Sequence, residues 1–167
     1  MSESAPHPGA PAGRARGVWL GIDVGAVRIG VARSDPGQIL AFPVRTVAFD
    51  RAGDESDAPA RADIAEVAAL AAEHEAVGVV VGLPRTLAGR EGPAARAARK
   101  FGDALATALS PIPVRYVDER MTTVVAQRNL SQSGVRAKAQ RAVVDQAAAV
   151  EILQSFLAGS AEQAPNV

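Results

Sequence analysis

Short apolar segments separated by turn residues predict five β-strands. The third segment contains Pro43, which indicates an edge strand or a bulge because proline lacks a backbone donor. The fourth, AVGVVVG, has no polar interruption, as expected of a strand that is covered on both faces. The predicted strands are residues 18–24, 28–34, 39–48, 76–82 and 112–119.

Helical periodicity fills the intervals between the later strands. Apolar side chains at positions 64, 67, 70 and 71 share one face of a helix over residues 63–75. Gly92-Pro93 opens a helix to about Leu109, Thr122 can cap one to about Ser131, and a last helix spans about 141–157. The order predicts an α/β fold with a mixed five-stranded sheet, in which three antiparallel strands precede two parallel ones, flanked by helices.

Composition limits the chemistry that the chain can perform. The 167 residues suit a single domain over 18–158, with a disordered tail at 1–17, a mobile acidic loop at 50–62 and a frayed end at 159–167. The absence of cysteine excludes disulfides and thiolate chemistry, and two histidines make a histidine metal site a poor prospect. With no apolar run of about 18 residues, we expect no membrane association and a cytoplasmic protein.

Charge is distributed unevenly although the formal net charge is zero. Residues 1–84 carry 7 basic and 11 acidic side chains, whereas residues 85–141 carry 11 basic and 4 acidic ones. A basic middle fits a polyanion such as nucleic acid, bound by one face. Solvated helix faces rich in arginine would explain the same counts, so charge alone leaves both interpretations open.

Several carboxylates stand in apolar surroundings. Asp23 follows VWLGI, and Asp118 and Glu119 end the segment IPVRYVDE. Asp145 shares a helix face with Ala148, Ala149, Ile152 and Phe156, so it lies within the stripe expected to be buried. An isolated ionised carboxylate is costly to bury and requires a cation or a proton. Each acid alone could pair with an arginine, but together they favour a shared site for Mg²⁺ or Mn²⁺, which prefer oxygen ligands.

Four segments resemble the signature blocks of the YqgF (RuvX-like) family. They are GIDVGAVRIGVARSD, VVVGLPRTLAG, VDERMTT and VVDQAAAVEILQ, in the family's order. The resemblance implies an RNase H-like fold and a metal-dependent nuclease. Members are described as candidate Holliday junction resolvases and as nucleases that mature the 5′ end of pre-16S ribosomal RNA.

The resemblance also implies the site residues. Asp23, Glu119 and Asp145 would be the catalytic metal ligands. Many other RNase H-like nucleases have an acid where this chain has Gly82, and Glu119 is taken to replace it, which leaves one or two metal ions open. Asp118 is a less favoured alternative to Glu119, since neighbouring strand residues point to opposite faces.

The other residues of these blocks suit contact with the substrate. Arg28 could reach a phosphate or pair with an acid, and Arg85 lies in a predicted loop at the end of a strand. Basic or hydroxyl side chains near Glu119 and in the basic segment 134–141, which is expected to be flexible, suit a nucleic-acid backbone. The full predicted set is Arg28, Arg85, Arg120, Thr122, Thr123, Arg136 and Lys138.

Three functions remain to be separated. The favoured one is an endonuclease acting on pre-rRNA, with branched DNA as the alternative substrate; a resolvase would require a symmetric dimer, so monomer and homodimer both stay open. The second is a phosphotransferase of the actin and hexokinase type, which shares an Asp-x-Gly hairpin but needs two such domains. The third is a non-catalytic RNA-binding scaffold, which would not need all three acids.

Overall fold

The computed structural model describes residues 15–50, 61–85, 88–119 and 137–159, with the backbone alone for residue 119 and residues 137–142. These ranges contain five strands and three helices. In chain order they are β1 (Trp19–Val24), β2 (Arg28–Ser34), β3 (Ala41–Ala48), α1 (Ala62–Glu73), β4 (Gly78–Pro84), α2 (Pro93–Leu109), β5 (Val114–Glu119) and α4 (Ala137–Gly159).

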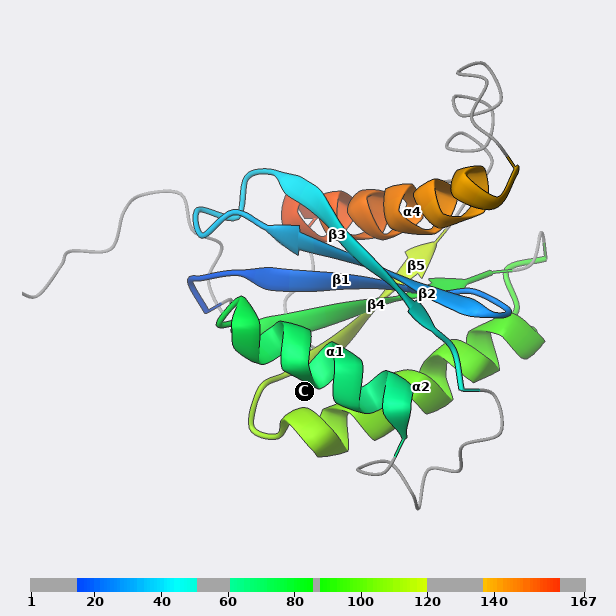
Figure 1. Ribbon diagram of the computed structural model, residues 1–167, viewed down its shortest axis with the longest axis horizontal. Helices are drawn as coiled ribbons and strands as arrows, with labels where there is room; N and C mark the ends of the chain where they lie inside the picture. The colour runs from blue at the N-terminus through cyan, green and yellow to red at the C-terminus, as the bar shows by residue number, and fades with distance from the viewer. Residues whose placement is uncertain (1–14, 51–60, 86–87, 120–136, 160–167) are drawn as a thin grey trace, which may run out of the picture.

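The strands form one mixed sheet in the order β3-β2-β1-β4-β5. The first three strands are antiparallel, and β4 and β5 run parallel to β1. Helix α4 packs on one face of the sheet, and α1 and α2 cover the other (Figure 1). This arrangement confirms the mixed five-stranded sheet expected from the sequence.

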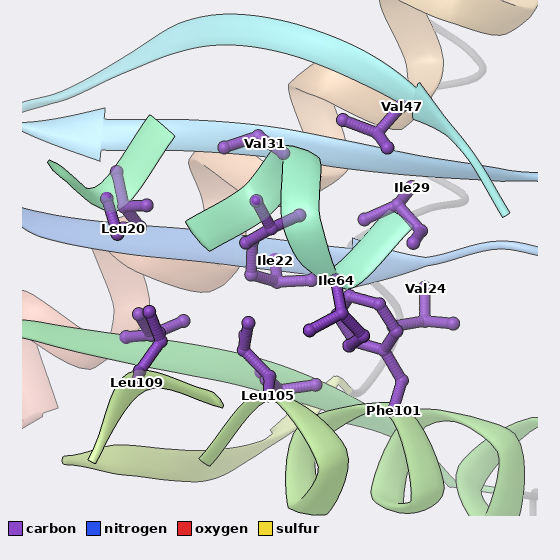
Figure 2. Close-up of a cluster of buried hydrophobic side chains, with 14 of the residues drawn as sticks. Leu20, Ile22, Val24, Ile29, Val31, Val47, Ile64, Phe101, Leu105 and Leu109 are labelled. Atoms are coloured by element: carbon purple, nitrogen blue, oxygen red, sulfur yellow. The ribbon is translucent and has the colours of Figure 1, made fainter. Parts of the chain in front are cut away.

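Each face of the sheet has its own apolar core. Leu20 and Ile22 of β1 pack against α1 and α2, where Phe101 and Leu105 contribute large side chains (Figure 2). Trp19, with the opposite orientation in the same strand, packs on the α4 side. The central strands are buried on both faces, which is why their sequences are nearly continuous apolar runs.

Strand β3 is an edge strand, as Pro43 predicts. Pro43 pairs with Ala32, directly after a break in register between Val31 and Ala32. An edge position tolerates the missing donor because the outer side of the strand has no partner strand.

Several element boundaries differ by a few residues from the expected ones, and two of these differences lie in segments that resemble the family or carry predicted substrate contacts. Strand β4 continues to Pro84 instead of ending at residue 82, because Leu83 and Pro84 pair with Asp118 and Glu119 of β5. Helix α4 begins at Ala137 rather than near residue 141, so the second half of the segment 134–141 is helical and not flexible. Its residues Ala-Lys-Ala-Gln have high helix propensity, which outweighs the polar composition.

A buried ion pair at the start of α1 was not anticipated from the sequence. Arg61 and Asp63 are 5% and 1% exposed, and the Arg61 Nη2 atom lies 2.7 Å from Asp63 Oδ2. Arg61 also donates to the carbonyl of Asp50 at 3.0 Å, and Asp63 accepts from the Asp50 N–H at 3.0 Å. The pair therefore joins the end of β3 to α1.

Several expectations lie outside the described residues. They concern the tail before residue 15, the loop 51–60, the helix at 122–131 and the end after residue 159. Among the described helices, none is both long and apolar enough to cross a membrane.

Candidate functional site

Two glycines allow the backbone of α4 to lie directly on the sheet. A Cβ atom at Gly30 of β2 would stand 1.9 Å from the carbonyl oxygen of Asp145, and one at Gly21 of β1 would stand 2.6 Å from Leu153 Cβ. Any side chain at either position would force the helix away. Gly21 and Gly30 therefore make room for α4.

This close packing places Asp145 over the pair of strands that carries Asp23. Asp23 pairs with Gly30 across the β1–β2 hairpin, and the main chain of Asp145 lies on Gly30. Asp23 alternates with Ile22 and Val24, which face α1 and α2, so its side chain lies on the face covered by α4. Two carboxylates from the first strand and the last helix thus share one end of the sheet.

Arg28 is the counter-ion of Asp145 in this structure. Its Nε atom donates to Asp145 Oδ2 at 3.1 Å, and the two side chains are 27% and 19% exposed. Burial raises the pKa of the Asp145 carboxyl above its ordinary value, and the hydrogen bond and charge of Arg28 oppose this shift without cancelling it. Asp145 is thus paired with an arginine, one of the two interpretations that the sequence allows for a buried acid.

Asp118 and Glu119 occupy different faces of β5 by strand alternation. Asp118 has the orientation of Tyr116, which packs on the side of α1 and α2, and it binds Arg85 with 2.8 Å between Arg85 Nε and Asp118 Oδ1. Glu119 pairs with Pro84 of β4 and has the strand parity of Val117, which packs on the α4 side. The Glu119 side chain itself is outside the described part of the chain.

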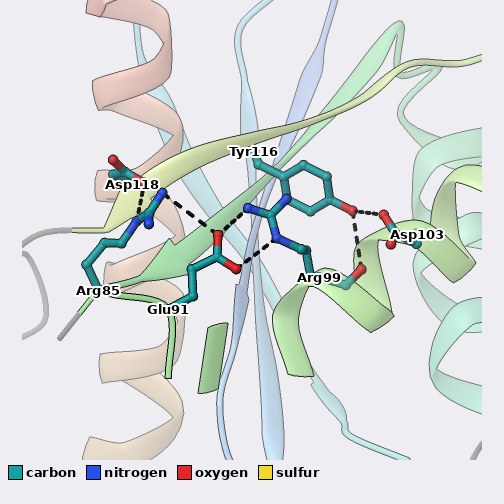
Figure 3. A network of polar contacts seen from close by, with 6 residues as sticks. All are labelled: Arg85, Glu91, Arg99, Asp103, Tyr116 and Asp118. Atoms are coloured by element: carbon teal, nitrogen blue, oxygen red, sulfur yellow. Dashed lines mark hydrogen bonds and ion pairs between the residues drawn. The ribbon is translucent and has the colours of Figure 1, made fainter. Parts of the chain in front are cut away.

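Arg85 belongs to an ion network rather than to an open loop. The backbone of Arg85 pairs with that of Glu91 in a short antiparallel β-bridge. The Arg85 side chain binds Asp118, and its Nη2 atom lies 3.8 Å from Glu91 Oε1 (Figure 3). The sequence could not reveal this network, since Glu91 and Asp118 lie far apart along the chain and give no local pattern.

The network continues from Glu91 into α2. Arg99 donates from Nε and Nη2 to the two carboxylate oxygens of Glu91, and this hydrogen bond is the main reason that the pKa of Glu91 lies below its ordinary value. The Tyr116 hydroxyl donates to Asp103 and lies 3.3 Å from the carbonyl of Arg99 (Figure 3). These contacts fix the β4–α2 connection against β5.

The remaining predicted substrate residues cannot be placed by their side chains. Arg120, Thr122, Thr123 and Arg136 are outside the described residues. Lys138 lies in the first turn of α4, where the backbone alone is described.

Oxygen donors are present for a metal ion, but the described residues do not complete a site. Within ranges 15–50, 61–85, 88–119 and 137–159 there is no group of three or more histidine, cysteine or acidic side chains that could hold a cation. Asp23 and Asp145 supply two carboxylates, a donor set that suits Mg²⁺ or Mn²⁺. A third ligand would have to come from outside the described side chains.

Solved structures define the class of the fold. Thermus thermophilus RuvC in complex with a Holliday junction substrate aligns with a TM-score of 0.52 and 18% identity, over 86% of this chain and 95% of that one. A second Thermus thermophilus RuvC structure aligns with a TM-score of 0.50 and 17% identity, over 84% and 93% of the two chains. The fold is therefore RNase H-like, as the resemblance implied.

Sequence comparison identifies the family. The RuvX family profile, described as Holliday junction resolvase, matches residues 17–159. A Mycobacterium tuberculosis protein named "Putative pre-16S rRNA nuclease" is 60% identical over 152 residues, which are 90% of this chain and 85% of that protein. A Frankia casuarinae protein of the same name is 51% identical over 140 residues, covering 84% and 66% of the two chains. The chain belongs to the RuvX family, and its enzymatic class is that of a nuclease.

Proposed function

We propose that this protein is an endonuclease that depends on a divalent metal and matures the 5′ end of pre-16S ribosomal RNA. The observation that carries the proposal is that the main chain of Asp145, near the end of the chain, lies on Gly30, which is the β2 partner of Asp23. A scaffold that only binds RNA has no need to place a carboxylate where burial disfavours its charge.

The proposed ligands of the cation are Asp23, Glu119 and Asp145. Asp23 and Asp145 stand on the α4 face of the sheet, and strand parity favours the same face for Glu119. The donor chemistry fits Mg²⁺ or Mn²⁺, which would supply an activated water and stabilise the leaving oxygen of a phosphodiester.

The chain's own residues would bind and orient the substrate around these acids. Arg28 is the favoured phosphate contact because it lies beside Asp145 and is part-exposed. Arg120, Thr122, Thr123, Arg136 and Lys138 are proposed contacts on sequence grounds. Arg85 is the least favoured of the set, because Asp118 and Glu91 already engage its guanidinium.

RNA is favoured as the substrate because the curated relatives, at 60% and 51% identity, are named for pre-16S rRNA. The family description names Holliday junctions instead, so branched DNA is the second candidate. Family membership gives no support to a nucleotide-binding phosphotransferase.

The test compares cleavage of a pre-16S leader fragment and a four-way DNA junction, each with Mg²⁺ or Mn²⁺. We expect cleavage of the RNA, and loss of it in Asp23→Asn, Glu119→Gln and Asp145→Asn with substrate binding largely retained. Asp35→Asn is the matched control, because Asp35 follows the last residue of β2, at the end of that strand away from Arg28 and Asp145. Cleavage of the junction alone would reverse the substrate assignment, and full activity in all three variants would refute the metal site.

A further inference from the structure

In the free enzyme, the contact with Asp145 uses only part of the hydrogen-bonding capacity of Arg28. Among the described residues, Asp145 is the hydrogen-bonding partner of the Arg28 side chain, through Nε alone. A guanidinium has five N–H donors and can engage a carboxylate with two parallel bonds. The observed contact uses one of them, so most of the donor capacity of Arg28 is left for another acceptor.

The Asp145 carboxylate lies beside the turn of the β1–β2 hairpin. Asp145 Oδ2 accepts from Arg28, and Asp145 Oδ1 lies 3.8 Å from the place that a Cβ atom of Gly25 would take. Gly25 in turn donates its N–H to the carbonyl of Arg28 at 2.8 Å, which closes the β1–β2 turn. Arg28 and the carboxylate are therefore held together at the end of the hairpin that also carries Asp23.

We infer that Arg28 is a resident counter-ion that competes with the divalent cation for Asp145 and, once displaced, binds a phosphate of the substrate. The inference rests on the proposed metal site at Asp23 and Asp145. A guanidinium 3.1 Å from a carboxylate that also serves a cation opposes that cation by like charge. Its planar fork suits the bidentate recognition of a phosphate.

The first test is Mn²⁺ affinity, measured by paramagnetic resonance titration of the full chain without nucleic acid. Arg28→Gln should bind Mn²⁺ about fivefold more tightly, the size expected when a partly exposed ion pair no longer competes. Arg33→Gln is the matched control, since Arg33 lies on the same strand but stacks over Phe42 with 5.6 Å to the ring centroid. Arg28→Lys, which keeps the charge, should remain close to wild type.

The second test asks where Arg28 acts when the cation is present. Binding of a pre-16S leader fragment is measured against salt concentration, with Ca²⁺ or with a chelator. In Ca²⁺ the salt slope of Arg28→Gln should fall by about one relative to wild type, as for the loss of one phosphate contact. With the chelator the two slopes should agree, because Asp145 then engages Arg28. Equal slopes in Ca²⁺ would overturn the inference.

The two proposals fail in different ways. If Asp145→Asn loses Mn²⁺ binding while Arg28→Gln binds Mn²⁺ no more tightly than wild type, the counter-ion role of Arg28 is wrong and the metal site stands. If Asp145→Asn binds Mn²⁺ as well as wild type, the metal site is wrong and the role of Arg28 falls with it. Circular dichroism of each variant establishes that the fold is intact before either comparison is made.

Discussion

At the scale of single residues, the sequence placed Asp145 on the apolar face of its helix but could not identify its partner. The apolar neighbours at helical spacing predict a buried carboxylate; Ala148, Ala149 and Ile152 are buried, and the Asp145 side chain is partly buried, with 19% of it exposed. Arg28 lies 117 positions away, and only the fold brings it to 3.1 Å. Arg61 and Asp63 were missed for another reason: two charged residues beside an acidic loop give no sign of burial.

Asp35 gives a prediction about pH. Its Oδ1 atom accepts from the N–H groups of Ile39 and Leu40 at 2.8 and 2.7 Å, and the bond from Leu40 is the main reason that the pKa of Asp35 lies below its ordinary value of 3.8. Asp35→Ala should lower the free energy of unfolding by about 1 kcal/mol at neutral pH, because two donors lose a charged acceptor near the surface.

The sign of the pH dependence follows from the lowered pKa. The stabilisation by ionised Asp35 is present above pH 3.8 and is lost as the pH falls through the lower pKa of the folded state. Urea unfolding of wild type and Asp35→Ala at several pH values should therefore show two stabilities that converge in acid. A difference that stays constant with pH would show that the carboxylate charge has no part in it.

At the scale of elements, the packing of α4 on β1 and β2 decides whether a site exists. Periodicity predicted the helix and the strands. The glycine pattern could not show which element approaches, because a missing side chain is compatible with a ligand or with a helix. The prediction for the segment around Lys138 was wrong in another way. Its basic composition suggested a flexible segment, whereas the residues from Ala137 onward favour and form a helix.

Gly30→Ala tests this packing. The added Cβ atom would stand 1.9 Å from the Asp145 carbonyl oxygen, so α4 must shift away from the hairpin. We expect a loss of about 3 kcal/mol in the free energy of unfolding, the upper end for overpacking, and a loss of cleavage that exceeds the change in folded population. Gly159→Ala is the control, because a Cβ atom there has no heavy atom within 4 Å. Full activity in Gly30→Ala would show that cleavage does not depend on the close packing of α4 on the hairpin.

At the scale of the whole molecule, the proposed ligands join the first strand to the last helix. The mixed five-stranded sheet could be predicted from the apolar runs, whereas the site depends on a contact between residues more than 100 positions apart. A cation bound by both Asp23 and Asp145 would link the first strand to the last helix. Binding to the folded state alone stabilises that state by mass action.

Metal removal should therefore change the stability of the entire protein. At a Mn²⁺ concentration of about 100 times the dissociation constant, the folded state gains about 2.7 kcal/mol, which for a chain of this size raises Tm by roughly 5–10 °C. Scanning calorimetry with Mn²⁺ and with a chelator measures this difference. In Asp23→Asn and Asp145→Asn most of it should disappear, because each removes a ligand from one end of the chain. If Mn²⁺ raises the Tm of both variants as much as that of wild type, the cation binds elsewhere, and Asp23 and Asp145 are not the metal ligands of the nuclease.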